Sequence, residues 1–287
     1  MILDSFLQYI SQNKDLYDAV FFDVDGTLTI AGKKVKNGPE TIAFLAENDI
    51  PFLLLTNDGN HSAEEKSEIL SKSDIYLSPQ HLVSSASPLK EYAKENNLIG
   101  KDVFVMGSLG TPSYAEKAGL KTVKDTNKIK DCECIIIGEN NYNWEKDITT
   151  VINFLIQYPE MPIVVANPDS YWPKSAIGIG IGAGGIARFI QTILSEYGID
   201  INPIYLGKPY KPVYISAEHN LQQNYGVTDI DPKRILLLGD SLRSDILGAN
   251  RMGFVSALIL TGITTEKHFD IFDKEPELKP DLIFKSL

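Results

Sequence analysis

Two aspartates directly follow a short apolar segment near the start of the chain. The segment Ala19-Val20-Phe21-Phe22 runs into Asp23-Val24-Asp25-Gly26-Thr27. Because side chains two apart on an extended segment point the same way, Asp23 and Asp25 would present two carboxylates where the strand ends. Gly26 permits a tight turn in which backbone N–H groups approach an anion such as phosphate. The pattern indicates metal or phosphate chemistry, although an acidic turn after a strand looks the same.

A second apolar segment, Ile235 to Leu238, leads into Asp240, and Asp245 follows five residues later. If both strands belong to one parallel sheet, Asp23, Asp25 and Asp240 meet at one edge, where bare carboxylates raise one another's pKa. Mg²⁺ resolves that conflict, because it prefers oxygen ligands and takes one or two protein carboxylates together with a substrate phosphate. The sequence therefore predicts a Mg²⁺ site here. Asp245 either contributes to this site or charges the start of the next helix.

Two further strand ends carry groups that bind phosphate. Leu53 to Leu55 is followed by Thr56 and Asn57, whose hydroxyl and amide can donate to phosphate oxygens. Ile204 to Leu206 is followed after one glycine by Lys208, which can neutralise a phosphate or an aspartyl intermediate. The formal charges of three carboxylates, one Mg²⁺ and one lysine cancel. An anion can therefore enter this site although the chain carries a net charge of -11.

The elements that must position these groups alternate regularly along the chain. Apolar residues at consecutive positions are typical of strands buried on both faces, as in parallel sheets covered by helices. Amphipathic segments between them have the capping residues of helices. The pattern predicts an α/β fold, a Rossmann-like doubly wound parallel sheet with a smaller α/β domain inserted. The predicted strands are 19–22, 51–55, 103–106, 135–137, 163–166, 204–206, 235–238 and 255–260, and the predicted helices are 40–47, 63–71, 88–96, 146–158, 186–197, 211–225 and 244–252.

Composition bounds the remaining possibilities. With 287 residues, 43% hydrophobic and 23% charged, the chain predicts a soluble globular protein of two domains, at about 150 residues per domain. The acidic balance disfavours nucleic-acid or membrane partners. The first residues have no basic lead or small-residue cleavage site, so we expect no secretory signal and a cytoplasmic location. Cys132 and Cys134 are expected to be buried thiols rather than a disulfide or a zinc site.

Four motifs in chain order resemble those of the haloacid dehalogenase-like phosphatase superfamily. They are Asp23-Val24-Asp25-Gly26-Thr27, Thr56-Asn57, Gly207-Lys208-Pro209, and Gly239-Asp240 with Asp245. The interval 82–203 resembles the large α/β cap of subfamily IIA, which includes p-nitrophenylphosphatase-like, phosphoglycolate, nucleotide and pyridoxal phosphate phosphatases. The resemblance implies a discontinuous catalytic core at 1–81 and 204–287, with the inserted cap at 82–203.

The same resemblance implies roles for the acidic residues. Asp23 would be the nucleophile and Asp25 the general acid and base. Mg²⁺ would be held by Asp23, by Asp240 and by the backbone carbonyl of Asp25, with Asp245 orienting the metal's ligands through water. A phosphatase acting through an aspartyl-phosphate follows from these roles.

For the phosphate, the resemblance implies binding by Thr56 and Lys208, with Asn57 supporting them or facing the substrate. Many relatives carry a second Asn and then Ser after this Thr-Asn pair. This chain has Asp58-Gly59-Asn60 instead. The phosphate chemistry is unaffected by that departure, and whether the family's contacts to the leaving group carry over is left open.

Selectivity for the organic part of the substrate is assigned to the inserted domain. Our candidates are Asn167, Asp169, Tyr171 and Trp172, because this loop follows a strand and mixes polar groups with aromatic rings. The two aromatic residues could equally pack the core of that domain. Small phosphorylated carbohydrates are a mild preference among the possible substrates.

Other functions use parts of the same pattern. A phosphotransferase, or a phospho-accepting signalling module, would need the same strand-end aspartate, Mg²⁺ and lysine. The module would need neither Asp25 nor a large inserted domain. Gly180 to Gly185 matches a dinucleotide-binding G-x-G-x-x-G, but it lies well past the nearest strand, and close packing of a loop and helix explains it better. A homo-oligomer remains possible.

Overall fold

The computed structural model describes residues 2–175 and 178–287. Its contacts divide the chain into two compact units. The core unit comprises 1–56, 63–83 and 208–287, and the inserted unit comprises 57–62 and 84–207. Segments 57–62 and 204–207, predicted to belong to the core, group with the inserted unit, whereas 82–83, predicted to belong to the cap, group with the core. The predicted α/β class, with a large parallel sheet, is confirmed.

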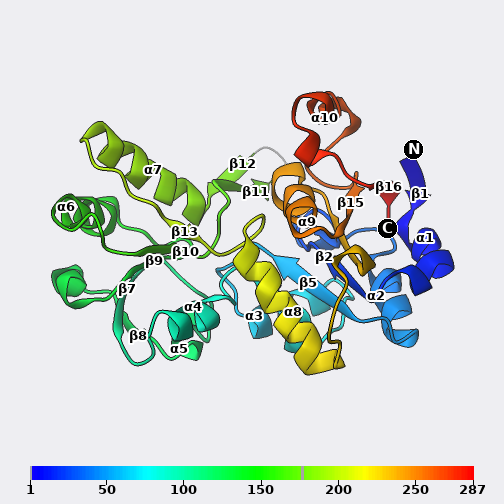
Figure 1. Ribbon diagram of the computed structural model, residues 1–287, viewed down its shortest axis with the longest axis horizontal. Helices are drawn as coiled ribbons and strands as arrows, with labels where there is room; N and C mark the ends of the chain where they lie inside the picture. The colour runs from blue at the N-terminus through cyan, green and yellow to red at the C-terminus, as the bar shows by residue number, and fades with distance from the viewer. Residues whose placement is uncertain (1, 176–177) are drawn as a thin grey trace. The chain divides into compact units, whose positions relative to one another are not determined.

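The core unit is built on a seven-stranded sheet whose neighbours from its first to its sixth strand pair in parallel (Figure 1). The order of the strands along the chain reverses between β2 (Ala19–Phe22) and β14 (Ile235–Gly239). Open α/β sheets bind their ligands at such a reversal point. The strands in order across the sheet are β1 (Ile2–Ser5), β16 (Leu282–Ser286), β15 (Val255–Ile259), β14 (Ile235–Gly239), β2 (Ala19–Phe22), β5 (Phe52–Thr56) and β6 (Leu82–Ser84), and β3 (Thr29–Ile30) and β4 (Lys33–Lys34) form a separate hairpin.

Helices cover both faces of this sheet, which explains why its central strands are apolar at every position. Along β2, Val20 and Phe22 belong to the hydrophobic cluster that includes α1, α2 and α3. Ala19 and Phe21, which point the other way, belong to the cluster with α8 and α9. The core sheet is thus doubly wound. The helices of this unit are α1 (Phe6–Asn13), α2 (Gly38–Glu47), α3 (Ala63–Ser71), α8 (Lys211–Tyr225), α9 (Leu247–Met252) and α10 (Ile271–Lys274).

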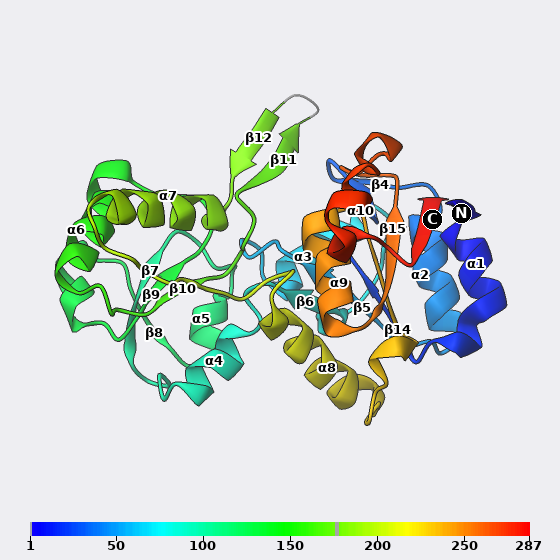
Figure 2. The ribbon, with the colours of Figure 1, turned by 45° about the horizontal axis from the view of Figure 1, so that its top comes forward.

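The inserted unit repeats this plan on a smaller scale (Figure 2). Its five-stranded sheet has parallel pairs throughout and lies between α6 and α7 on one face and α4 and α5 on the other. An antiparallel hairpin precedes α7. The elements are β13 (Ile204–Tyr205), β10 (Ile163–Val165), β9 (Ile135–Ile137), β7 (Asp102–Met106) and β8 (Lys121–Val123) across the sheet, the hairpin strands β11 (Tyr171–Ser175) and β12 (Gly178–Ile181), and the helices α4 (Leu89–Glu95), α5 (Tyr114–Lys117), α6 (Thr149–Gln157) and α7 (Ala183–Glu196).

The two cysteines lie in the interior of the inserted unit. Cys132 and Cys134 are both buried and not bonded to each other, as predicted. Burial raises the pKa of the Cys134 thiol to about 12, so it stays protonated at neutral pH. Both residues therefore serve as small apolar core residues.

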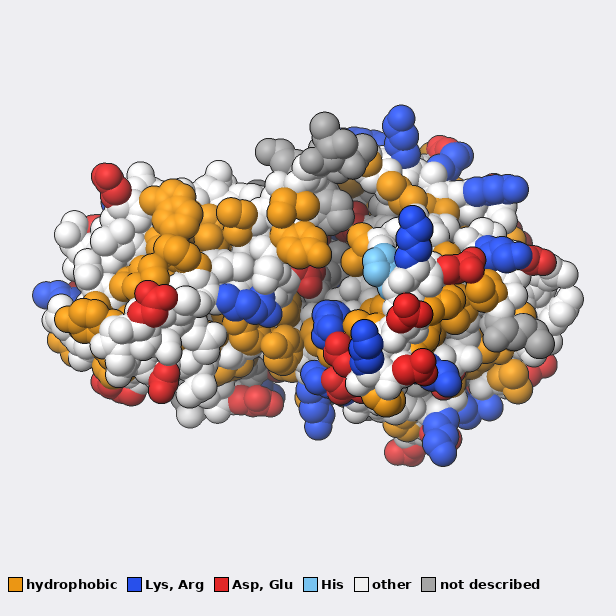
Figure 3. Space-filling model, turned by 90° about the horizontal axis from the view of Figure 1, so that it is seen from above, with side chains coloured by type: hydrophobic (Ala, Val, Ile, Leu, Met, Phe, Trp, Pro, Cys, Tyr) orange, Lys and Arg blue, Asp and Glu red, His pale blue; other side chains and the backbone are white. Residues whose placement is uncertain are grey.

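The surface mixes side chains of every kind. On the face drawn in Figure 3, acidic and basic side chains are interspersed and hydrophobic ones also reach the surface. In the inserted unit the exposed apolar residues include Trp144, Tyr171 and Ile179. Within the described residues, no helix has the length and apolar character needed to cross a membrane.

Candidate active site

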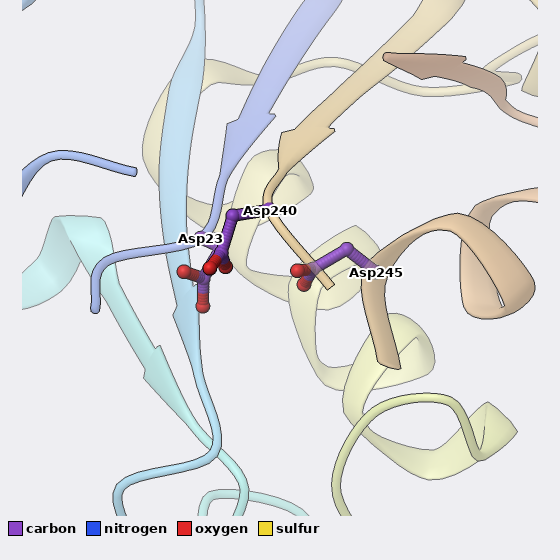
Figure 4. A group of neighbouring side chains, drawn as sticks. All are labelled: Asp23, Asp240 and Asp245. Atoms are coloured by element: carbon purple, nitrogen blue, oxygen red, sulfur yellow. The ribbon is translucent and has the colours of Figure 1, made fainter. Parts of the chain in front are cut away.

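The site lies at the carboxyl ends of β2 and β14, where the chain order of the core sheet reverses. Phe22 pairs with Leu238, and the backbone N–H of Asp23 donates to the Leu238 carbonyl at 2.8 Å. This register places Asp23 and Asp240 side by side just past the two strand ends. Figure 4 shows their carboxylates, with that of Asp245, directed toward one another. One oxygen from each of these three residues lies within 4.8 Å of the others, and all three residues are buried.

Lys208 connects two of these carboxylates. Its Nζ donates to Asp23 Oδ1 at 2.7 Å and to Asp245 Oδ1 at 2.6 Å. The residue is 1% exposed. Burial alone would lower the pKa of Lys208, but the two aspartates outweigh burial and hold that pKa above its ordinary value. Lys208 therefore carries a fixed positive charge beside Asp23.

One ammonium does not balance three buried carboxylates. Burial raises the pKa of Asp23 to about 7 despite Lys208, and Asp245 pushes it the same way. Burial, followed by the charges of Asp23 and Asp245, raises the pKa of Asp240 well above its ordinary range. Asp23 Oδ2 is buried and has no hydrogen-bond partner among the described residues. A divalent cation with a preference for oxygen ligands fits this donor set, since it would stabilise the ionised carboxylates and engage that oxygen.

Two glycines make room for the Asp240 carboxylate. Gly26 has a φ of +112°, which side-chain-bearing residues rarely adopt, and a Cβ there would overlap that carboxylate. A Cβ at Gly262 would overlap it from the other side. The backbone N–H of Ile263 donates to Asp240 Oδ2 at 2.6 Å, so the loop after β15 also fixes this side chain. Sequence reasoning gave Gly262 and Ile263 no role at the site.

Asp25 does not join the group of three carboxylates, contrary to the expectation that it would converge with Asp23 and Asp240. The reason is that β2 ends at Phe22, so the alternation of an extended strand does not continue to Asp25. Its Oδ2 instead accepts a hydrogen bond from Lys66 Nζ at 2.8 Å. Lys66 was missed from the sequence. The available signal was its spacing of four residues from Leu70, which places a lysine on the buried face of α3.

Two of the predicted phosphate ligands, Thr56 and Asn57, are neighbours in the sequence but belong to different units. Thr56 ends β5 and is buried in the core unit. Asn57 begins the inserted unit, where its Nδ2 donates to Asp169 Oδ2 at 3.1 Å. Asn57 thus contacts one of the predicted selectivity residues. The peptide bond to Thr56 keeps it next to the predicted phosphate ligand.

The Asp58-Gly59-Asn60 departure forms an ordered turn. Asp58 Oδ1 accepts from the backbone N–H groups of Asn60 and His61 at 3.0 and 3.3 Å, and its Oδ2 lies 2.8 Å from His61 Nδ1. The Asp58 side chain therefore stabilises the turn that follows Asn57. This local role explains an aspartate at the position.

The other selectivity candidates form a chain of hydrogen bonds at the carboxyl end of β10. Asn167 Oδ1 accepts from the Asp169 backbone N–H at 2.8 Å, and Asn167 Nδ2 donates to Glu139 Oε1 at 2.5 Å. Glu139 is 2% exposed and follows β9. Sequence reasoning missed Glu139, although an acidic residue just past an apolar strand is the same signal that identified Asp23.

The two aromatic candidates differ. Tyr171 is 57% exposed, whereas Trp172 is partly buried and its ring occupies the space beside Gly180 on the partner strand. A Cβ at Gly184 would overlap the Pro168 carbonyl. The glycine-rich segment 180–185 thus lets the hairpin, the loop after β10 and the start of α7 pack closely, as expected.

Two family models match separate parts of the chain. A family model described as haloacid dehalogenase-like hydrolase matches residues 20–121, and one described as HAD-hydrolase-like matches residues 205–287. This chain belongs to the haloacid dehalogenase-like hydrolases. The matched ranges contain the strand-end aspartates, Thr56 and Lys208, so the motifs that suggested the family lie in the parts that match it.

The individual relatives share about a quarter of their residues with this chain. An acid sugar phosphatase of Staphylococcus haemolyticus is 25% identical over 94% of both chains. A fusion of cardiolipin synthase (CMP-forming) with a mitochondrial hydrolase from Schizosaccharomyces pombe is 27% identical over 85% of this chain. The match spans 48% of that fusion protein, about half its length.

Solved structures share the whole fold. A possible sugar phosphatase of the same superfamily from Cytophaga hutchinsonii has a TM-score of 0.80 and 27% identity, and the match covers 100% of this chain and 98% of the other. A glycerol phosphate phosphatase from Mycobacterium tuberculosis, solved with magnesium, has a TM-score of 0.75 and 22% identity, covering 98% and 77%. At that identity the second likeness concerns the fold alone.

Proposed function

We propose that this protein is a Mg²⁺-dependent phosphatase that hydrolyses phosphate monoesters of small molecules, with sugar phosphates as the favoured class. The observation that carries the proposal is the buried group of Asp23, Asp240 and Asp245, joined by Lys208, at the reversal point of a parallel sheet. The names of the sugar phosphatase relatives, and the magnesium in the structure with the same fold, support the substrate class and the metal.

In the first step an oxygen of ionised Asp23 forms a bond to phosphorus while the bond to the leaving oxygen breaks. Protonated Asp25 donates its proton to that oxygen, and Lys208 offsets negative charge beside Asp23. Asp23 and Asp240 would hold Mg²⁺, and Asp245 would orient its ligands through water. The bound ion would neutralise charge on the phosphoryl oxygens. The products of this step are an alcohol and an aspartyl-phosphate.

In the second step water attacks the phosphorus and the bond from Asp23 to phosphorus breaks. Ionised Asp25 takes the water's proton, which returns both aspartates to their starting states. The Thr56 hydroxyl, the Asn57 amide and the backbone at Gly26 are assigned to the phosphoryl group. Lys208 remains charged throughout, because the Asp245 carboxylate stays beside it while Asp23 carries the phosphoryl group.

The inserted unit is assigned to the organic part of the substrate through Asn167, Asp169 and Tyr171. Hydrogen-bond acceptors in this cluster suit the hydroxyl groups of a sugar. A cytoplasmic location and a possible homo-oligomer stay predictions, and two fungal relatives are named as mitochondrial hydrolases.

The test is phosphate release from a panel of phosphate monoesters, with Mg²⁺ and then with a chelator. We expect release from several sugar phosphates, its loss on chelation and its return with added Mg²⁺. Asp23→Asn should lower turnover by about 10⁴-fold or more, because the nucleophile is lost. The midpoint temperature of thermal unfolding should stay unchanged, because asparagine has the same shape as aspartate. The exposed Asp15→Asn serves as the matched control.

Activity of the Asp23→Asn variant near that of the wild type would reject the proposal. Product that appears only with an added acceptor alcohol would identify a phosphotransferase. A single round of labelling without continued phosphate release would identify a phospho-accepting module.

A further inference from the structure

We propose that Lys66 is a positioning residue that holds the Asp25 carboxylate in place to protonate poor leaving groups. The inference rests on the proposed function, since it needs Asp25 to be the general acid. It assigns a task to a buried charged residue that the mechanism above does not use. It also predicts how the loss of that residue would depend on the substrate.

The ion pair between Lys66 and Asp25 is unusually one-sided. The Lys66 side chain is 8% exposed and the Asp25 side chain 58% exposed, with 2.8 Å between Nζ and Oδ2. An ordinary surface pair in the same unit, Lys34 with Asp74, is 51% and 57% exposed. Such surface pairs contribute little to stability. The Lys66 pair buries its cation instead.

A buried ammonium is a costly choice at this position. Desolvating a charge costs several kcal/mol, and apolar replacements of a buried pair are often as stable or more stable. Lys66 and Leu70 are the two buried residues of α3, so an apolar side chain at 66 would continue the face that packs on the sheet. Stability alone does not explain a lysine here, whereas a task for its charge does.

That task follows from how loosely Asp25 is otherwise held. The backbone around it is fixed, because the Gly26 N–H donates to the Thr29 carbonyl at 2.7 Å. Its carboxylate, by contrast, reaches solvent, and the Thr29 hydroxyl donates to its Oδ1 only at the long distance of 3.5 Å. A general acid must stay within hydrogen-bond reach of the oxygen it protonates. Lys66 restricts Asp25 to one orientation by binding Oδ2, which leaves Oδ1 for the proton.

The need for that proton depends on the leaving group. An alkoxide leaves only if it is protonated as the bond to phosphorus breaks, whereas nitrophenolate leaves as a stable anion. A defect in the position of Asp25 therefore slows alkyl phosphates much more than p-nitrophenyl phosphate. A general loss of structure would slow both alike.

The experiment measures kcat/KM, which reports the steps up to leaving-group departure, for alkyl phosphates and for a series of substituted phenyl phosphates. For Lys66→Met we expect a loss of about 10- to 100-fold on alkyl phosphates and less than about threefold on p-nitrophenyl phosphate, a part of the 10²–10⁴-fold that acid catalysis supplies. Lys66→Arg should recover part of the loss. The exposed Lys72→Met is the matched control and should leave every rate unchanged.

Asp25→Asn and the double variant separate this inference from the proposed function. If Asp25→Asn deepens the dependence on the leaving group and Lys66→Met adds nothing to it, both stand. If Asp25→Asn has that effect and Lys66→Met lowers all rates equally or not at all, the role of Lys66 is wrong and the mechanism survives. If Asp25→Asn leaves the dependence unchanged, the acid role of Asp25 fails and the inference fails with it.

Discussion

The two units place carboxylates at the same topological position and neutralise them in different ways. Each has a parallel sheet, and in each a carboxylate follows a buried central strand: Asp23 after β2 in the core and Glu139 after β9 in the inserted unit. Asp23 accepts a hydrogen bond from the ammonium of Lys208 at 2.7 Å. Glu139 accepts one from the neutral amide of Asn167 at 2.5 Å.

Burial raises the pKa of both Asp23 and Glu139 to about 7, so their charge states differ only when a divalent cation joins Lys208 in the core. In the core, Lys208 and a divalent cation can keep buried carboxylates ionised, as a nucleophile requires. In the inserted unit, burial raises the pKa of Glu139 to about 7 against the opposing effect of Asn167, and the nearby Asp58 and Asp169 raise it further. A proton can therefore do for Glu139 what cations do for Asp23. Under the proposed function, the countercharge beside a strand-end carboxylate decides whether it serves as a nucleophile or as a structural acid.

The largest expected effect comes from removing the core's countercharge. Lys208→Met leaves Asp23 and Asp245 buried without their ammonium, so we expect the free energy of unfolding to fall by about 3–5 kcal/mol without metal. Phosphate release should fall by about 10²–10³-fold or more, as when a charge-stabilising donor is lost. Denaturant unfolding and kcat/KM measure the two effects, with the exposed Lys211→Met as control. Stability and activity near those of the wild type would mean that Lys208 does not balance the charge of Asp23 and Asp245.

The next largest effect is the pH dependence of the free energy of unfolding that Glu139 of the inserted unit contributes. The pKa of Glu139 rises from 4.5 to about 7 on folding, so the folded state holds a proton that the unfolded state has released in this range. The contribution of Glu139 to stability is therefore complete below pH 4.5 and is lost as the pH rises to about 7. Relative to Glu139→Gln, the wild type should lose on the order of 3 kcal/mol across this window.

Glutamine suits this test because it is neutral, has the same shape and can still accept the hydrogen bond from Asn167. The free energy of unfolding of both proteins is measured at several pH values, and the difference between them isolates Glu139 from the other titrating groups. If the two profiles run parallel through the window, Glu139 is ionised in the folded protein and the contrast between the units is wrong.

The sequence was informative where local pattern alone determines structure. Strands buried on both faces, such as β14, are apolar at every position, and the polar residue after each one marks a strand end at the sheet's carboxyl edge. The edge strand β1 and its neighbour β16 escaped prediction because Asp4 and Lys285 face solvent and pair with each other at 2.7 Å, which breaks the apolar run. Asp240 could be predicted for the same reason that β14 could.

Residues whose role depends on a partner far along the chain could not be found in this way. Lys66 gains its meaning from Asp25, 41 residues away, and Glu139 from Asn167, 28 residues away. A helix face that contains one lysine looks like imperfect amphipathicity until the fold supplies the carboxylate. Asp25 stands outside the group of Asp23, Asp240 and Asp245 because β2 ends at Phe22 and the chain turns at Gly26, which the strand pattern did not reveal.

The smallest effect concerns the hairpin of the inserted unit, where we expect opposite results from replacing Tyr171 and Trp172. Tyr171 is 57% exposed, so Tyr171→Ala should change the free energy of unfolding by no more than about 0.5 kcal/mol. If it contacts the organic part of the substrate, the ratio of kcat/KM between a sugar phosphate and p-nitrophenyl phosphate should shift by up to about tenfold. Trp172→Ala, which empties the space beside Gly180, should instead lower stability, by about 1 kcal/mol or more, and serves as the contrast. An equal loss on both substrates in Tyr171→Ala would remove Tyr171 from substrate selection and leave the inserted unit's polar cluster as the remaining candidate.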